Sequence, residues 1–106
     1  MNEREMNVIN ILFQSPVEMT STDICNAQRG LTQSTVIAVL RKLLKSNLIE
    51  TAGVTHSGKV LSRTYRPAPG AKKAVIECFI QELDKVKHVF SIDELAEAVK
   101  DGAQGA

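Results

Sequence analysis

The chain has 106 residues, a formal net charge of +1 and 43% hydrophobic residues. This length allows one domain with a single modest core. The two cysteines, Cys25 and Cys78, lie far apart and outside any CxxC pair, which argues against a disulfide scaffold and for a reducing compartment. No signal peptide and no apolar run of membrane-spanning length is visible, so we expect a cytoplasmic protein that makes no use of a membrane.

Two helices are predicted before residue 30. The first covers about residues 3–14, where Asn2 can cap the helix and Glu5 stands at the capping-box position. It ends at Ser15, because the following Pro16 disfavours a helical residue before it. Its apolar residues recur at helical spacing, at Met6, Ile9, Leu12 and Phe13, and are expected to form one buried stripe. The second covers about residues 21–28, where Thr20 and Asp23 form a capping box.

The third helix is predicted over about residues 33–46, capped by Thr32. Its apolar residues fall on one side, at Val36, Val39, Leu40, Leu43 and Leu44. The other side holds Ser34, Ala38, Arg41 and Lys45, with Thr35 and Lys42 beside them. Small side chains near the helix start allow close approach to base edges, and the positive helix end favours phosphate. An ordinary amphipathic surface helix is the alternative interpretation.

Two antiparallel strands are predicted over residues 48–54 and 60–66, with residues 55–59 as the loop. We expect Leu61 and Tyr65 to share one face, and Lys59 and Arg63 to lean outward. A helix-turn-helix followed by a hairpin "wing" is the geometry of a protein that reads duplex DNA. The fold class predicted is therefore mainly α with a small β-hairpin, a winged helix-turn-helix.

Two further helices are predicted over residues 71–87 and 92–100, followed by a frayed tail. The first carries a broad apolar face, made of Val75, Ile76, Phe79, Ile80, Leu83 and Val86. This face exceeds what a three-helix winged core needs, which indicates dimerisation through the same helix of a second copy. Packing within its own chain is the alternative. The expected organisation is a DNA-binding domain over 1–68, C-terminal dimerisation helices over 69–101 and a flexible tail over 102–106.

Charge is strongly segregated along the chain. Residues 29–73 have a net charge of +8, whereas residues 1–28 carry −3 and residues 74–106 carry −4. The basic segment coincides with the third helix and the hairpin, as expected for a surface that meets a polyanion.

The stretch LTQSTVIAVLRKLLKSNLIE and the following SGKVLSRTYRP resemble the winged-helix repressors of the penicillinase-repressor type (the BlaI/MecI/CopY group). The matching positions are Ser34-Thr35-Val36, Leu40 with Leu43, and Tyr65-Arg66-Pro67. The resemblance covers about residues 5–70. It implies homodimers that bind an inverted-repeat operator and silence a promoter. The C-terminal part does not match that family's proteolytic switch site, and it lacks the cysteine cluster of the copper-sensing members.

These features predict a sequence-specific, DNA-binding transcriptional regulator, with repression implied by the resemblance. The residues expected to read bases are Gln33, Ser34, Thr35, Ala38 and Arg41. The residues expected to hold phosphates are Thr32, Lys42 and Lys45, joined on the wing by His56, Ser57, Lys59 and Arg63. No catalytic or metal-binding motif is present, so we expect neither an enzyme nor a cofactor.

Three alternatives stay open on sequence grounds. A winged helix can serve as a protein-interaction module, although the basic outer face of the third helix argues for DNA. A regulator of this kind can also respond to a small molecule at its dimer interface. Finally, Cys25 or Cys78 can act as a redox switch. The operator and the inducing signal are not encoded in any motif we recognise.

Overall fold

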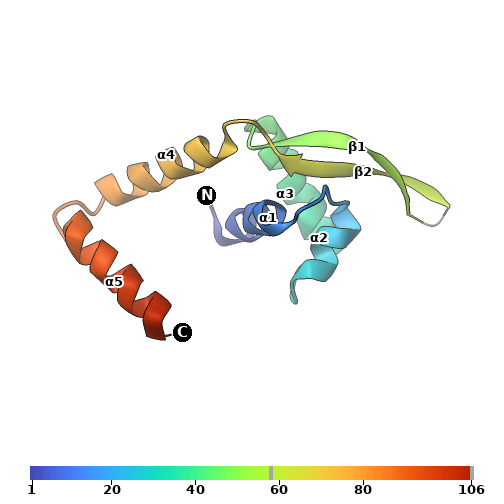
Figure 1. Cartoon of the computed structure of the whole chain (residues 1–106). Coiled ribbons are helices and arrows are strands. Elements are labelled where there is room, and N and C mark those ends of the chain that lie inside the picture. The colour runs from blue at the N-terminus through green and yellow to red at the C-terminus, as the bar shows by residue number, and fades with distance from the viewer. Residues whose placement is uncertain (58, 106) are drawn as a thin grey trace. The chain divides into compact units, whose positions relative to one another are not determined.

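The computed structural model describes residues 1–57 and 59–105. These residues form five helices and one two-stranded antiparallel sheet, so the prediction of a mainly α chain with one hairpin is confirmed (Figure 1). The elements are α1 (Glu3–Gln14), α2 (Ser21–Ala27), α3 (Gln33–Lys45), β1 (Ile49–Ser57), β2 (Val60–Pro67), α4 (Ala71–Asp84) and α5 (Ile92–Gly105). The chain divides into two compact units, Met1–Val75 and Ile76–Ala106.

The core of the first unit lies between α1, α2, α3 and the start of β1. Its members are Val8, Ile9, Ile11, Leu12, Ile24, Val36, Val39, Leu40, Leu43, Leu48 and Ile49. The helical spacing of the apolar residues in α3 therefore turns one side of that helix inward. The prediction that Phe13 is buried is wrong. Phe13 lies about 40° beyond Ile9, which is the edge of the buried stripe on that side, and it belongs to the last turn of α1.

Short-range hydrogen bonds fix where the helices begin. Both predicted capping boxes, Asn2 with Glu5 in α1 and Thr20 with Asp23 in α2, are present. Thr32 caps α3 by accepting a hydrogen bond from the backbone N–H of Thr35. Each side-chain oxygen satisfies a donor that the first helical turn leaves without a partner.

The end of α3 sets the direction of the wing. Asn47 has a φ of 60°, in the left-handed region. The N–H of Asn47 donates to the Leu44 carbonyl, and the N–H of Leu48 donates to the Leu43 carbonyl. This is a Schellman motif. It lets β1 begin at Ile49, almost directly after the helix.

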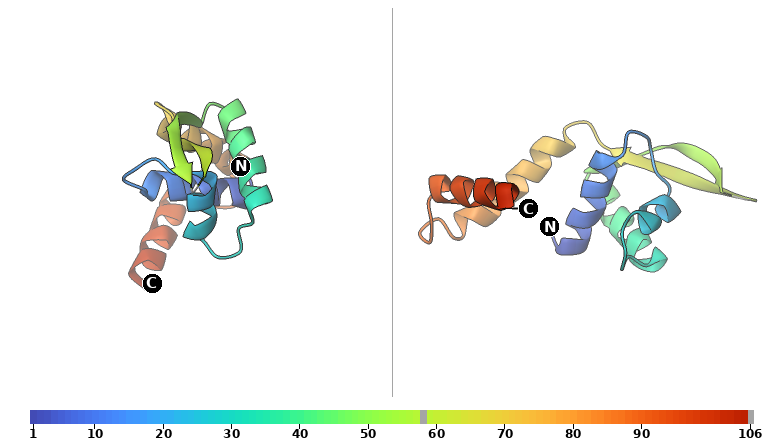
Figure 2. Two further views of the ribbon diagram at one scale, coloured as in Figure 1. Left: turned by 90° about the vertical axis from the view of Figure 1, so that its right-hand side faces the viewer. Right: turned by 60° about the horizontal axis from the view of Figure 1, so that its bottom comes forward.

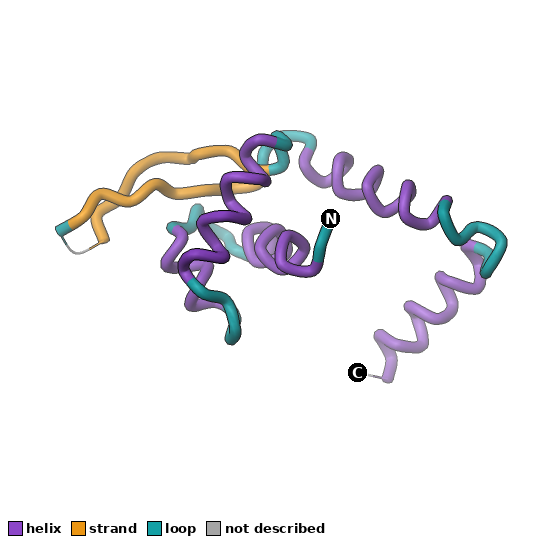
Figure 3. The backbone as a smooth tube through the Cα atoms, turned by 180° about the vertical axis from the view of Figure 1, so that it is seen from behind, coloured by secondary structure: helices purple, strands orange, loops and turns teal. Residues whose placement is uncertain are grey.

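The hairpin is longer than predicted. Its ladder runs from the pair Ile49–Pro67 to the pair Ser57–Val60. The predicted loop over residues 55–59 is therefore wrong, because residues 55–57 belong to β1. A register shift between Thr51 and Gly53 leaves Ala52 as a β-bulge, which bends and twists the strand. Figure 2 and Figure 3 show the hairpin reaching beyond the helices of its unit.

The predicted faces of β2 also need correction. Alternate residues of a strand point to the same face, so Arg63 shares the face of Leu61 and Tyr65. Tyr65 is half-buried against the core, whereas Leu61 is exposed.

In the second unit, the helix limits differ from those predicted. Helix α4 ends at Asp84, and the following N–H groups of Lys85 and Val86 donate to carbonyls three residues back, at Glu82 and Leu83. Helix α5 continues to Gly105, so the predicted frayed tail is wrong for residues 102–105. No proline stops the helix there. Residue 106 lies outside the described part of the chain.

The predicted domain boundary was residue 68, whereas the two units divide within α4. Ala71 is buried, and both Ala74 and Val75 pack against the core of the first unit. The first turn of α4 therefore belongs to the winged unit, because its apolar side chains complete that core.

Candidate nucleic-acid interface

The outer face of α3 is open, as the sequence predicts. Thr32, Gln33, Ser34, Ala38, Arg41, Lys42 and Lys45 are exposed, and Thr35 is half-buried. On the inner side, Val36, Leu40 and Leu43 are buried almost completely. One side of the helix thus anchors it in the core and leaves the opposite side free to enter a groove.

Four polar side chains at the start of α3 are held by hydrogen bonds within the protein. The Thr32 hydroxyl donates to Thr35 Oγ1 at 2.9 Å, and the Gln33 amide donates to Ser21 Oγ at 2.7 Å. The second bond ties α3 to α2. Ser34 Oγ lies 3.3 Å from Thr32 Oγ1. These bonds orient the end of the helix that would approach base edges.

Sequence reasoning missed one residue of this face. Ile37 is 38% exposed although it is a large apolar residue. It follows Ser34 by three residues and precedes Arg41 by four, so it lies on the same side of the helix. The helical spacing of Ile37 relative to Ser34 and Arg41 could have placed it on this face from the sequence alone. An exposed aliphatic side chain is able to make apolar contact with a group such as the methyl of thymine.

A shallow groove of about 300 Å³ separates the outer side of α3 from the hairpin. Its lining residues are Ser21, Ile37, Leu40, Arg41, Leu44, Ser62, Arg63 and Tyr65. The fold therefore brings Arg41 of α3 and Arg63 of β2 to one groove. Both arginines are exposed, and neither has an acidic partner within ion-pair distance among residues 1–57 and 59–105. Two unpaired guanidinium groups at one groove are suited to an anion such as a DNA phosphate.

On the wing, His56 and Lys59 are exposed as predicted. The side chain of Ser57, and Gly58 as a whole, lie outside the described part. Nearer the base of the hairpin, Arg66 Nε donates to Glu50 Oε1 at 2.7 Å, so the charge of Arg66 is balanced there. Lys59 and Arg63 supply the positive charge further along the hairpin.

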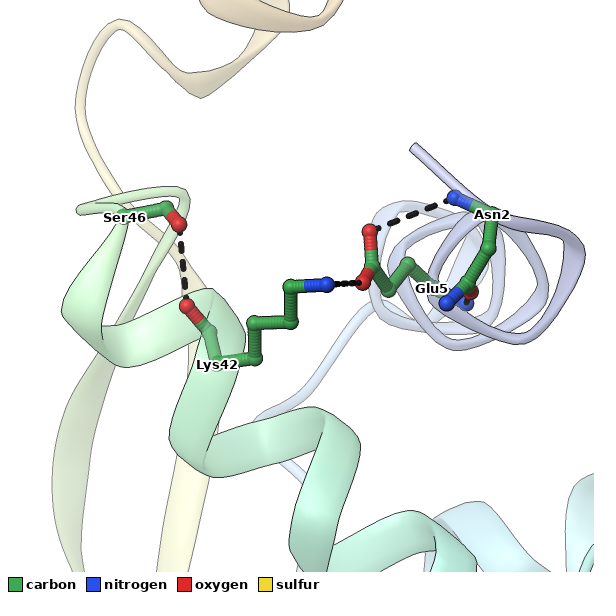
Figure 4. Close-up of polar contacts among 4 residues, drawn as sticks. All are labelled: Asn2, Glu5, Lys42 and Ser46. Carbon is green, nitrogen blue, oxygen red and sulfur yellow. Dashed lines mark hydrogen bonds and ion pairs between the residues drawn. The ribbon is translucent and has the colours of Figure 1, made fainter.

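Lys42 is placed differently from the other predicted phosphate ligands. Its Nζ lies 2.7 Å from Oε1 of Glu5, whose side chain is 7% exposed (Figure 4). The other carboxylate oxygen accepts the N–H of Asn2 at 3.3 Å. The Lys42 ammonium is the main cause that holds the pKa of Glu5 below its ordinary value, while burial acts in the opposite direction. Lys42 thereby joins α3 to α1.

Of the residues predicted to form the dimer, Val75 is used inside the first unit, where it packs against the core. Val75 is half-buried there, so its own unit covers part of a side chain that was assigned to the intersubunit face. In the second unit, Ile76, Phe79 and Ile80 are 48–57% exposed. Val86 is also exposed and Leu83 is half-buried.

The two cysteines are free thiols and both are half-buried. Cys25 Sγ donates to the Leu31 carbonyl at 3.1 Å, across the turn between α2 and α3. This contact favours a structural role for Cys25. Within the described ranges, no three His, Cys, Asp or Glu side chains gather as a metal site requires.

Several solved structures resemble the chain along most of its length. PadR of Bacillus subtilis, solved in complex with operator DNA, matches with a TM-score of 0.58 at 13% identity, over 92% of this chain and 67% of that one. The chain has a winged helix-turn-helix fold. The adhesin competence repressor of Streptococcus pyogenes gives a TM-score of 0.58 at 17% identity, over 97% of this chain and 76% of that one.

A MarR family regulator from Neisseria meningitidis gives a TM-score of 0.54 at 22% identity, over 99% of this chain and 80% of that one. At these identities the likeness concerns the fold. No protein-family model and no curated protein sequence matches the chain. The resemblance to penicillinase repressors therefore stays a prediction. Among the helices of the described residues, none has the length and apolar character needed to cross a bilayer.

Proposed function

We propose that this protein is a sequence-specific transcriptional regulator that binds double-stranded DNA in the cytoplasm. The observation that supports it best is the open outer face of α3, with Arg41 beside Arg63 at the groove next to the hairpin. A fold that presents one helix and a basic hairpin to the same side suits a duplex, whose major groove admits a helix. The structural similarity to PadR of Bacillus subtilis, which was solved in complex with operator DNA, also supports this proposal.

Base recognition is assigned to the outer face of α3 from its first residue, Gln33, to Arg41. Ser34 and Ala38 are short enough to allow close approach, and Arg41 can donate two hydrogen bonds to one guanine. Ile37 joins them through apolar contact with thymine. Gln33 takes part through its amide oxygen, because its amide nitrogen donates to Ser21, and Thr35 takes part as a donor, because its oxygen accepts from Thr32.

Phosphate contacts are assigned to the two ends of α3 and to the wing. Thr32 and Lys45 lie at its two ends, and His56, Ser57, Lys59 and Arg63 come from the wing. Lys42 is given a positioning role instead, because Glu5 already holds its ammonium. Phosphate contacts set the register on the duplex and make affinity depend on salt.

We further propose a homodimeric repressor that binds an inverted repeat. Helix α4 exposes the apolar residues Ile76, Phe79 and Ile80, and an exposed apolar face of this kind is typical of a protein–protein interface. In a dimer with twofold symmetry, the same face of a second copy packs against it. Each protomer then reads one half-site. Repression and membership of the penicillinase-repressor group follow from the sequence resemblance, and no cofactor or enzymatic activity is part of the proposal.

The test is to select duplex fragments from a random pool with the purified protein and to sequence them. We expect an enriched inverted repeat whose half-sites are about one helical turn apart, 10–10.5 base pairs, or a multiple of this. Binding should weaken steeply as salt rises. A pool without enrichment, together with no affinity for duplex at low salt, would contradict the proposal and favour a protein-interaction module.

A further inference from the structure

The far half of the hairpin exposes an unusual amount of apolar surface. Val54, Val60 and Leu61 are 62–65% exposed. Scattered single apolar residues are common on protein surfaces. Here, however, all three belong to the last four pairs of the β1–β2 ladder. A hairpin that projects from its unit with such residues has a surface prepared for a partner.

The strand register tells which of these residues act together. Val54 pairs with Arg63, and His56 pairs with Leu61. Directly opposed residues share a face of the sheet, and so do alternate residues of one strand. Val54, His56, Leu61 and Arg63 therefore form one face of the hairpin, here called the Arg63 face. Val60 pairs with Ser57 and belongs to the other face.

The Arg63 face continues the surface of the recognition helix. Arg63 lines the groove that Arg41 and Ile37 of α3 also line. Leu61 precedes Arg63 by two residues in β2, which places it about 7 Å further from the base of the hairpin at the rise of a strand. That distance equals about two base-pair steps of a duplex. A duplex seated on α3 would thus extend toward Leu61.

Charge indicates what kind of partner covers this face. No acidic residue occurs between Thr51 and Ile76, and Lys59 and Arg63 flank Leu61 in the chain. An apolar residue with a cation on either side is able to enter the minor groove of a duplex. There arginine is attracted to the negative potential of a narrow groove, and leucine is one of the residues that enter between base steps and kink the duplex.

We propose, on the basis of the DNA-binding function proposed above, that the Arg63 face enters the minor groove beside the site read by α3. Leu61 acts there as a wedge that partly unstacks one base step and bends the DNA. The wedge selects for flexible pyrimidine–purine steps at that position, since these unstack most easily. The wing is then a reader of DNA deformability as well as a holder of phosphates.

The first experiment measures the bend of the bound duplex by energy transfer between dyes at its two ends. The duplex is a fragment selected by the protein itself. We expect Leu61→Ser to reduce the bend by roughly 20° or more and to weaken binding on the order of tenfold. Because Leu61 is exposed, the variant should keep its helical circular dichroism. Val17→Ser is the matched control: Val17 is 69% exposed in the segment between α1 and α2.

A second duplex separates wedging from simple contact. A mismatch at the wedged step removes much of the unstacking cost in advance. Leu61→Ser should recover most of the lost affinity on this duplex, whereas Arg63→Ala should not. A Leu61→Ser variant that is equally weak on both duplexes would overturn the wedge.

The outcomes also distinguish this inference from the function on which it rests. If the wild-type protein binds DNA but leaves it straight, or if Leu61→Ser bends it as the wild type does, the wedge is refuted and the DNA-binding function stands. If the wild-type protein binds no duplex, the proposed function itself fails.

Discussion

Asn47 occupies the one left-handed position among the described non-glycine residues, with a φ of 60°. Its conformation lets the Asn47 and Leu48 N–H groups close the end of α3, and so it sets the angle at which the wing leaves the helix. Asparagine tolerates this region better than residues with branched side chains.

We therefore expect Asn47→Val to lower the free energy of unfolding by about 1–2 kcal/mol, measured by urea denaturation. Asn47→Gly should stay within about 0.5 kcal/mol of the wild type, because glycine adopts positive φ freely. Equal losses in both variants would show that the Asn47 side chain, and not the backbone conformation, is needed.

The contact between Glu5 and Lys42 is also expected to affect the free energy of unfolding. Lys42 holds the pKa of Glu5 below its ordinary value of 4.5. A carboxyl whose pKa is lower in the folded state stabilises the fold above its unfolded pKa, and this contribution is lost as the pH falls through the folded value.

Glu5→Gln should thus cost about 1–2 kcal/mol of unfolding free energy at pH 7, the cost of losing a charged hydrogen bond. The difference from wild type should shrink as the pH falls below 4.5. Urea titrations at several pH values measure it. Glu3→Gln, in the same first turn but exposed, is the control and should behave as wild type. A difference that is independent of pH would refute the ionic contribution.

Among the elements, α3 is expected to supply selectivity. If Arg41 pairs with a guanine, Arg41→Ala should cost about 1–3 kcal/mol of binding free energy and relax the preference at that base pair. Titrations on operators altered at single positions measure both effects. Lys45→Ala, at the end of the same helix, should weaken all sequences alike. An unchanged base preference in Arg41→Ala would move Arg41 from base reading to phosphate binding.

The hairpin is expected to supply affinity that depends on salt. Lys59→Ala should weaken binding to all sequences alike, and it should reduce the slope of log affinity against log salt by about one. Lys100→Ala, on α5, removes the same charge outside the proposed interface and should leave the slope unchanged. A normal slope in Lys59→Ala would exclude Lys59 from the interface.

The molecule as a whole is expected to work as a pair. Phe79→Glu puts a charge into the exposed apolar face of α4, so it should convert a dimer to a monomer in sedimentation experiments. Binding to the full inverted repeat should then fall to that of one half-site. Gln81→Glu, which adds the same charge to an exposed position elsewhere on α4, is the control. A wild-type protein that sediments as a monomer at micromolar concentration would contradict the proposed dimer.

Features that depend on neighbours in the chain could be predicted from the sequence. The capping boxes at Asn2 and Thr20 join residues three positions apart, and the inward side of α3 follows from the helical repeat. The hairpin was likewise predicted, since turn residues separate two strand-like segments. Such signals are local, so the backbone forms them largely without help from distant segments.

Features that join distant segments came from the folded chain. Lys42 was predicted to face phosphate, but α1 packs beside α3 and offers it Glu5. Val75 was predicted to face a second copy, but it lies close enough to the core to pack there. Arg41 and Arg63 line one groove although they belong to different elements, α3 and β2. The physical reason is the same in each case: helical and strand periods fix which way a side chain points, whereas its partner depends on packing between elements.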